Sequence, residues 1–192
     1  MPQKTDPRKK HLLLSEERYE ALQPEKLLRK LGVRAGDTVA DIGCGPGFFT
    51  LPAAAIAGQR GMVLAADIQG EMLTTVRSRA AEQGLTNVRV LKTSESEIPL
   101  PEGSCDFVLL AFVLDEVDQR STFLHRAARA MKSTGKLAVL EWDRVESEGP
   151  PLEDRISREE LVEDAHAAGL HVRDSGDLGE SQYYYVFARV AK

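Results

Sequence analysis

The chain has 192 residues, of which 42% are hydrophobic and 29% are charged, as is ordinary for a globular protein. This length suits one domain, and we expect residues 1–10 to form a flexible tail ahead of a single domain over residues 11–192. The formal net charge of −5 provides no general attraction to nucleic acid or to an anionic membrane, so neither is an expected partner.

The two cysteines, Cys44 and Cys105, have no metal-ligand spacing and are too few for a disulfide framework. No apolar run reaches the roughly 18 residues that a membrane-spanning helix needs. The chain also begins without the charged and apolar regions of a signal peptide. We therefore expect a cytoplasmic protein without a bound metal. The sequence leaves open whether two copies pair as a homodimer.

Short apolar segments alternate with segments of helical pattern along most of the chain. This alternation predicts βαβ units and a mainly parallel sheet. In chain order the pattern predicts a helix over 25–31, a strand over 38–42, a helix over 48–57, a strand over 62–68, a helix over 71–83, strands over 88–92 and 105–112, a helix over 119–131 and a strand over 137–142.

The last part of the chain has a different pattern. A capping box that starts at Ser157 predicts a helix over 158–168. Two strands are expected at 170–174 and 183–189, and the turn-rich link at 175–177 is too short for a crossover helix, so they should pair antiparallel. The predicted fold is α/β: a doubly wound, Rossmann-like sheet of about seven strands, with an antiparallel C-terminal strand and helices on both faces.

A glycine-rich loop, Gly43-Cys44-Gly45-Pro46-Gly47, follows the first predicted strand. Glycines at such a junction let the backbone turn tightly and let a ligand approach the main chain. In an open α/β sheet, ligands bind at the carboxyl ends of the strands, so this loop is the expected binding site. The third glycine of the dinucleotide pattern GxGxxG is missing, because Phe48 stands in its place.

The charge of Asp41, just before this loop, separates two classes of ligand. Two like charges about 4 Å apart cost roughly 4 kcal/mol at an effective dielectric constant near 20, so a diphosphate beside this carboxylate is disfavoured. S-adenosylmethionine presents an ammonium and a sulfonium instead, and the same carboxylate attracts both. Asp67, at the end of the second strand, could bind the ribose of either ligand, or cap the helix that follows.

Four stretches of the sequence resemble class I S-adenosylmethionine-dependent methyltransferases. They are VADIGCGPGFFT (39–50), AADI (65–68), the segment 88–117 and GKLAVLEW (135–142). The nearest subgroup resembles the ubiquinone/menaquinone-biosynthesis C-methyltransferases, and the resemblance covers roughly residues 12–190. It implies a Rossmann-like fold, S-adenosylmethionine as the cofactor, S-adenosylhomocysteine as the product and a small-molecule methyl acceptor.

The resemblance also implies roles for individual residues. The methionine end of the cofactor would be held by Asp41, Gly43, Cys44 and Gly45. Ala111, late in the fourth strand, would offer its carbonyl to the ammonium of the cofactor.

The nucleoside end of the cofactor would lie beside the second and third strands. The resemblance implies that Asp67 binds the ribose diol and that Ile68 packs on the adenine. Where the family usually has Asp followed by a small residue to read the adenine amino group, this chain has Ser94 followed by Glu95. Adenine recognition would then run through the Ser94 hydroxyl, the Glu95 backbone or a shifted carboxylate.

Methyl transfer from a sulfonium is an in-line displacement, and proximity alone can supply roughly 7–11 kcal/mol of such a barrier. A general base is needed only when the acceptor must lose a proton. Acidic residues gather where the fourth and fifth strands end, and we select Asp115 and Glu141 as the candidate catalytic residues because they are nearest to the cofactor crevice. Relatives often carry His at the position of Asp115.

The segment with His11, Arg18 and Tyr19 precedes the first expected helix. It either packs its leucines on the core or forms a lid over the cofactor, with Tyr19 facing the sulfonium. Trp142, at the carboxyl end of a strand, is the candidate wall of the acceptor pocket.

The leading hypothesis is therefore a methyltransferase that acts on a small molecule. An NAD-dependent oxidoreductase is disfavoured by the glycine spacing and Asp41, whereas a non-catalytic S-adenosylmethionine-binding protein stays open because of Ser94 and Glu95. A nucleic-acid methyltransferase would carry an Asn/Asp-Pro-Pro-aromatic motif after the fourth strand, where this chain reads AFVLD (111–115). An arsenite-type enzyme would need more thiols than two cysteines provide.

Overall fold

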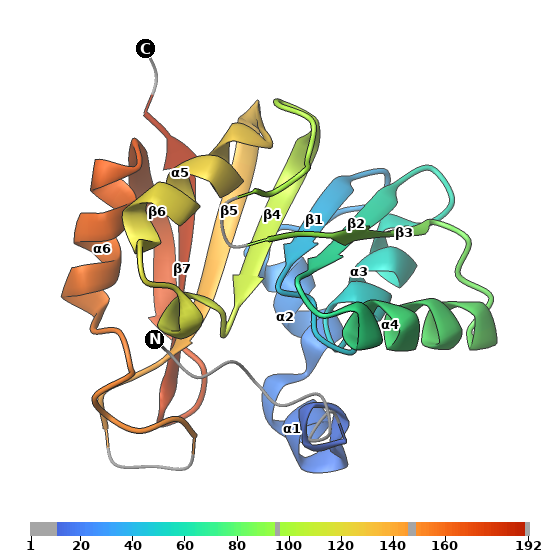
Figure 1. Ribbon diagram of the computed structural model, residues 1–192, viewed down its shortest axis with the longest axis horizontal. Coiled ribbons are helices and arrows are strands. Elements are labelled where there is room, and N and C mark those ends of the chain that lie inside the picture. The colour runs from blue at the N-terminus through green and yellow to red at the C-terminus, as the bar shows by residue number, and fades with distance from the viewer. Residues whose placement is uncertain (1–10, 95–96, 146–148, 191–192) are drawn as a thin grey trace.

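The computed structural model describes residues 11–94, 97–145 and 149–190, and the expected tail at 1–10 lies outside these ranges. A seven-stranded sheet in the order β3-β2-β1-β4-β5-β7-β6 forms the middle layer (Figure 1). The strands are β1 Thr38–Ile42, β2 Met62–Asp67, β3 Val88–Lys92, β4 Cys105–Ala111, β5 Met131–Trp142, β6 Leu170–Asp177 and β7 Gln182–Arg189.

The strand directions confirm the predicted fold class. β3, β2, β1, β4 and β5 run parallel to one another, and β7 pairs antiparallel with both β5 and β6. The chain moves outward from β1 to β2 and β3, then returns to the other side of β1 as β4. This reversal of strand order is the point at which open α/β sheets bind their ligands.

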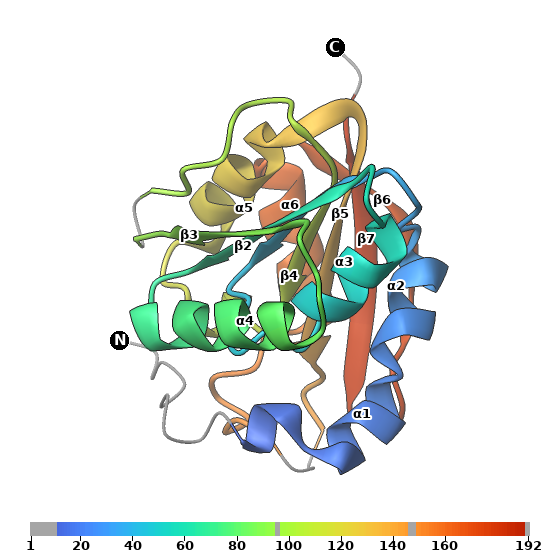
Figure 2. The same ribbon diagram turned by 90° about the vertical axis from the view of Figure 1, so that its right-hand side faces the viewer.

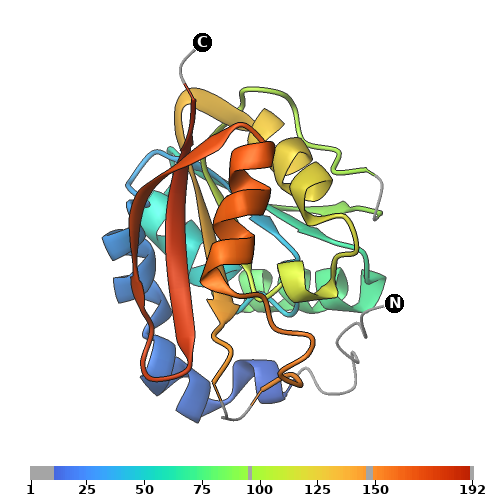
Figure 3. The same cartoon turned by 90° about the vertical axis from the view of Figure 1, so that its left-hand side faces the viewer.

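Helices cover both faces of the sheet. α2, α3 and α4 lie on one face, as Figure 2 shows, and α5 and α6 lie on the other, as Figure 3 shows. The helical segments are η2 Leu12–Leu14, α1 Glu16–Leu22, α2 Pro24–Leu31, α3 Thr50–Ala57, α4 Gly70–Glu82, η3 Leu114–Glu116, α5 Arg120–Arg129 and α6 Arg158–Ala167.

The core follows from the alternation of side chains along each strand. On β4, Leu109 packs in the cluster under α2 and α3, whereas Leu110 packs in the cluster under α5 and α6. Both are fully buried, as expected for a parallel strand with helices on either side. The central strands are thus fixed from both faces, and their carboxyl ends form a stable edge for a site.

The capping box predicted at Ser157 is present at the start of α6. The Ser157 side chain accepts the backbone N–H of Glu160, and the Glu160 carboxylate accepts the backbone N–H of Ser157 at 2.8 Å, so α6 begins as predicted.

The N-terminal segment contains α1, a helix that the sequence analysis did not assign. The Ser15 hydroxyl accepts the backbone N–H of Arg18, which caps the first turn. The helix ends at Gln23, whose φ of 40° is left-handed, and Pro24 then starts α2 in the position that suits proline.

Three expected boundaries are corrected by the structure. Residues 45–49 are turns, so α3 begins at Thr50 rather than at residue 48. Residues 131–136 belong to β5 rather than to a helix and a loop, because Met131 pairs with Cys105. The 175–177 link is part of β6, where a Cβ on Gly176 would lie 2.8 Å from Tyr184 Cε1, so close packing under this ring explains the glycine.

No helix within the described ranges is long and apolar enough to cross a membrane.

Candidate active site

A cavity of about 900 Å³ opens at the carboxyl ends of β1, β2 and β4. Its volume is within the range of small-molecule sites. The walls are formed by the glycine loop, the ends of β2 and β4, η3, the start of α5 and, from outside the sheet, the η2–α1 segment. This is the switch point that the sequence predicted, because β1 has β2 on one side and β4 on the other.

The glycine loop depends on the absence of side chains. Gly43 has a φ of +73°, and a Cβ on it would lie 2.4 Å from the Cγ2 atom of Val113. The backbone N–H groups of Gly43 and Cys44 both donate to the carbonyl of Ala66, at 2.7 and 3.1 Å, which ties the loop to β2. The loop is therefore packed between β2 and the segment after β4, and it leaves main chain at the cavity wall.

Asp41 lies at the base of the cavity with 2% of its surface exposed. Its Oδ2 atom accepts the hydroxyl of Thr50 at 2.5 Å. Burial raises the pKa of Asp41 to about 7, the bond from Thr50 lowers it, and Asp67 raises it further. A buried acid with such a pKa favours a cationic neighbour, which restores the charged form.

Asp67 connects the glycine loop to the beginning of α4. Its Oδ2 atom accepts the backbone N–H of Gly45 at 2.9 Å, and its Oδ1 atom accepts that of Gln69 at 2.8 Å. Burial raises the pKa of this carboxyl group against these hydrogen bonds, which lower it. Gln69 is the N-cap residue of α4, so Asp67 braces the helix start without occupying the cap position.

The backbone turns sharply where β4 ends. Phe112 has a φ of 59°, a left-handed conformation that costs a non-glycine residue roughly 1–3 kcal/mol. Residues in this conformation are found preferentially at active sites and ligand sites. Its ring lies 5.7 Å from that of Trp142, and both rings line the cavity. The turn thereby places Ala111 and Val113 beside the glycine loop.

Glu141 lies beneath this turn with 1% of its surface exposed. Its Oε1 atom accepts the backbone N–H groups of Val113 and Leu114, at 3.1 and 2.9 Å. Burial, and next the charge of Asp115, raise its pKa well above the usual range. Glu141 is not among the cavity-lining residues. The structure therefore places it against the loop after β4 and not at the cavity wall.

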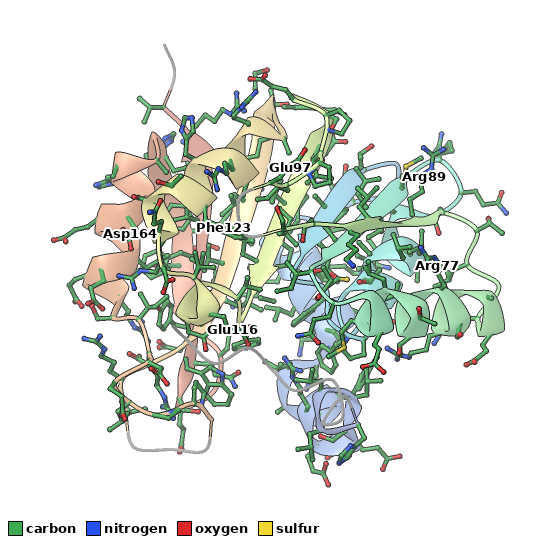
Figure 4. The ribbon with its side chains drawn as sticks, in the orientation of Figure 1. Arg77, Arg89, Glu97, Glu116, Phe123 and Asp164 are labelled. Carbon is green, nitrogen blue, oxygen red and sulfur yellow. The ribbon has the colours of Figure 1, made fainter. Side chains whose placement is uncertain are left out.

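Asp115 is on η3 and lines the cavity. Its Oδ1 atom is buried and has no hydrogen-bond partner within the described part of the chain. Burial, followed by the charge of Glu116, raises the pKa of Asp115 to about 6. Glu116 and Phe123, labelled in Figure 4, come from η3 and α5 and line the same cavity.

The η2–α1 segment places Arg18 at the cavity wall, and not Tyr19, which was the expected residue. Tyr19 does not line the cavity; its ring packs 4.6 Å from that of Phe48, and its hydroxyl accepts a hydrogen bond from Arg79 at 3.5 Å. Arg18 lines the cavity instead, with its guanidinium carbon 4.5 Å from the centre of the Phe48 ring. The sequence pattern alone indicates no role for Arg18.

The structure brings most of the other expected cofactor residues to one cavity: Gly43, Cys44, Gly45, Asp67, Ile68, Ser94 and Ala111 all line it. Glu95 lies outside the described residues. The pKa of the Cys44 thiol is raised by burial and by the nearby acids Asp41 and Asp67, so this side chain remains a small neutral group in the loop.

These residues fit the cofactor that the sequence favours. The glycine loop leaves main chain at the cavity wall, and the carboxylates of Asp41 and Asp67 lie beside it. Such a donor set attracts a positively charged group and repels a diphosphate.

Comparison with known proteins identifies the same class. The model of the ubiE/COQ5 methyltransferase family matches residues 13–152. A "Ubiquinone/menaquinone biosynthesis C-methyltransferase UbiE" of Marinomonas sp. (strain MWYL1) is 37% identical over 118 residues, which are 61% of this chain and 47% of that protein. The protein of the same name from Azotobacter vinelandii is 36% identical over 59% of this chain and 45% of its own length. The chain thus spans about half the length of these curated relatives.

Solved structures support the assignment over the full fold. A SAM-dependent methyltransferase from Aquifex aeolicus has a TM-score of 0.92 and 34% identity, covering 97% of this chain and 100% of that one. A geranyl diphosphate methyltransferase in complex with SAM shares the fold, with a TM-score of 0.73, 18% identity and coverage of 97% and 92%. The expected class and the S-adenosylmethionine cofactor are confirmed at this level, and the oxidoreductase alternative loses its support. The chain belongs to the ubiE/COQ5 methyltransferase family.

Proposed function

We propose that this chain catalyses methyl transfer from S-adenosylmethionine to a small-molecule acceptor that binds beside η3, with Asp115 as the general base. The observation that carries the proposal is the buried Oδ1 atom of Asp115, which has no hydrogen-bond partner in the described part of the chain and belongs to a cavity-lining residue. Unsatisfied buried polar atoms are rare, and at a ligand site they mark a partner that binding supplies.

The cofactor would occupy the half of the cavity beneath the glycine loop. Asp67, Ile68 and Ser94 would hold its nucleoside end, and Asp41, the glycine loop and the Ala111 carbonyl would hold its methionine end. When bound, S-adenosylmethionine supplies a methyl group on a positively charged sulfur. Asp41 would return to its charged form beside the cationic end, because a nearby positive charge lowers the pKa of a buried acid.

The acceptor would occupy the other half of the cavity, where aromatic rings and acids meet. Phe112, Phe123 and Trp142 provide flat apolar surfaces, and Asp115 lies among them. Such a wall suits an acceptor with a planar body and one proton that it must lose, for example a phenol or an enol. The relatives named for ubiquinone and menaquinone biosynthesis make ring C-methylation the first chemistry to test.

Asp115 has the properties that a general base needs at neutral pH. With a pKa of about 6 it is mostly deprotonated at pH 7 and more basic than an ordinary aspartate. A proton taken by its free Oδ1 atom would also satisfy that buried atom.

Glu141, the other candidate from the sequence, would act as a positioning residue. Its two hydrogen bonds to the N–H groups of Val113 and Leu114 fix the backbone that leads directly into Asp115. It would thereby hold the base against the acceptor without touching the acceptor.

A screen of methyl-acceptor metabolites, with products detected by mass, tests the activity. With the wild-type chain, one of the acceptors should gain about 14 mass units, the mass of the CH₂ added when a methyl group replaces a hydrogen. This product should form only when S-adenosylmethionine is present. Asp115→Asn keeps the shape of the base and removes its basicity, so kcat should fall by about 100-fold or more while S-adenosylhomocysteine affinity stays unchanged.

Glu116→Gln is the comparison at the neighbouring position: it keeps the proposed base, and because the charge of Glu116 raises the pKa of Asp115, it should move the pH dependence of the rate to lower pH without abolishing the rate. A full rate for Asp115→Asn would overturn the role of Asp115. Binding of S-adenosylhomocysteine without methylation of any acceptor would instead support the non-catalytic alternative.

A further inference from the structure

Arg18 brings a positive charge to the cavity wall. Its Nη1 atom donates to the carbonyl of Leu13 at 3.1 Å, and no ion pair forms between Arg18 and an acid within residues 11–94, 97–145 and 149–190. An arginine has five N–H donors, so most of them are available to a ligand. Burial lowers the pKa of Arg18 to about 10, the direction expected for a cation that has lost water without gaining an anion.

This charge lies where the two walls of the cofactor site meet. The Arg18 guanidinium carbon is 4.5 Å from the centre of the Phe48 ring, which follows the glycine loop, and 5.3 Å from that of Phe112, which follows Ala111. Leu13, whose carbonyl accepts the hydrogen bond from Arg18, also lies close to the glycine loop. Its Cδ1 atom would be 3.8 Å from a Cβ on Gly45. Arg18 is thus placed at the methionine end of the site rather than at the nucleoside end.

The methionine end of the cofactor carries two opposite charges, an ammonium and a carboxylate. The groups assigned to this end so far are the Asp41 carboxylate, the glycine loop and the Ala111 carbonyl. The carboxylate and the carbonyl present oxygen atoms, which can balance only the ammonium. A carboxylate bound there without a cation would be costly to desolvate.

We propose that Arg18 binds the α-carboxylate of S-adenosylmethionine and of S-adenosylhomocysteine. A guanidinium can bind a carboxylate through two parallel N–H···O bonds, which gives orientation as well as affinity. The η2–α1 segment then serves as a charged cover for the cofactor, in a role that the sequence analysis sought for Tyr19. The inference rests on the cofactor of the family and not on the acceptor or on Asp115.

An anionic acceptor is the rival ligand for Arg18, and the charges on the acceptor side argue against it. Asp115, Glu116 and Asp118 line the cavity after β4 and outnumber Arg126 of α5, which also lines it, so their net charge would repel an anion there. The two ligands can be separated by experiment, because only one of them belongs to the cofactor.

The test compares two ligands on two chains by calorimetry. S-adenosylhomocysteine carries the α-carboxylate, and its decarboxylated analogue S-adenosyl-3-thiopropylamine is otherwise identical. Arg18→Gln should weaken S-adenosylhomocysteine binding by about 10- to 100-fold, the loss expected for charged hydrogen bonds, and should leave the analogue within about threefold of its wild-type affinity. Arg29→Gln, at an exposed position of α2, makes the same change in net charge and should alter neither affinity.

Equal weakening of both ligands by Arg18→Gln would overturn the proposal, because it would indicate a general disturbance of the site. Unchanged S-adenosylhomocysteine affinity would also overturn it and would point to an anionic acceptor. Should Arg18→Gln not fold, Arg18→Lys makes the same comparison with the charge kept and the paired geometry lost. Equal affinity of the wild-type chain for both ligands would contradict the proposal without any variant.

Discussion

Gly43 and Val113 are in direct contact across the cavity base, so that a Cβ on Gly43 would lie 2.4 Å from the Val113 Cγ2 atom. Gly43 opens the loop that follows β1, and Val113 belongs to the turn after β4. The two halves of the cofactor site are therefore packed against each other, and a change at one must move the other. Tight interiors of this kind transmit small displacements.

Gly43→Ala should destabilise the fold by about 1–3 kcal/mol and weaken S-adenosylhomocysteine binding, because alanine meets both the positive φ and the Val113 side chain. Adding Val113→Ala should recover part of both losses by removing the clash while the backbone strain remains. Chemical denaturation and calorimetry measure the two quantities. Additive losses in the double variant would show that the contact is not the cause.

Asp67→Ala should lose at least tenfold in S-adenosylhomocysteine affinity while the protein stays folded, since it removes the proposed ribose acceptor. Asp67→Asn keeps an oxygen that can accept the N–H of Gly45, so it should retain the loop and lose less. Circular dichroism checks the fold, and calorimetry measures the affinity. Unchanged binding by Asp67→Ala would refute the ribose role.

The pKa of Asp41 predicts how cofactor binding responds to pH. Burial raises this pKa to about 7 in the free chain, and a bound ammonium should lower it, so binding should release a proton. Affinity for S-adenosylhomocysteine should then rise with pH up to about 7, by at most about tenfold per pH unit, and level off above it. Asp41→Asn should remove this slope. A flat wild-type profile between pH 5.5 and 7.5 (from about 1.5 units below the shifted pKa to about 0.5 unit above it) would contradict the account.

The same shift predicts a stability effect of opposite sign. Because the folded-state pKa of Asp41 lies above the ordinary value of 3.8, the native chain binds more protons than the unfolded chain between about pH 4 and 7. The contribution of this group to the free energy of unfolding should therefore decrease as pH rises through that window. Urea denaturation of the wild type and of Asp41→Asn measures the difference, and an equal slope in both chains would exclude Asp41 as its source.

The rate of methyl transfer should depend on Asp115 in its deprotonated form. With a pKa of about 6 in the free chain, kcat/KM for an acceptor that loses a proton should rise as pH increases through 6 and reach a plateau near about 7.5. Asp115→Asn should lower the rate and abolish this acidic limb. Glu141→Gln keeps an oxygen that can accept the Val113 and Leu114 N–H groups, so it should retain the limb at a reduced kcat. A limb that persists in Asp115→Asn would assign the base elsewhere.

Much of the fold and of the cofactor site follows from local sequence patterns. The glycine loop was predicted because glycines at 43–47 directly follow the apolar segment of β1, and its position in the cavity agrees with that prediction. Strands with buried side chains on both faces, such as β4, can be predicted in the same way, because they are continuous apolar segments of the sequence.

Features set by contacts between distant segments were harder to predict. The sequence could not tell which side chain of α1 faces the cavity, because Arg18 is placed by the rings of Phe48 and Phe112. Gly176 looked like a turn residue, and only the ring of Tyr184 on the neighbouring strand explains it. Glu141 looked like a base, because nothing local reveals the two N–H groups that it accepts from the turn after β4.

The most direct test of the central claim is a thermal-shift titration of the wild-type chain with S-adenosylhomocysteine and, separately, with NAD. At about 100 times its dissociation constant, S-adenosylhomocysteine should add about 2.7 kcal/mol to the free energy of unfolding, and NAD should add nothing. Stabilisation by NAD without any by S-adenosylhomocysteine would contradict a site built around the negative charge of Asp41.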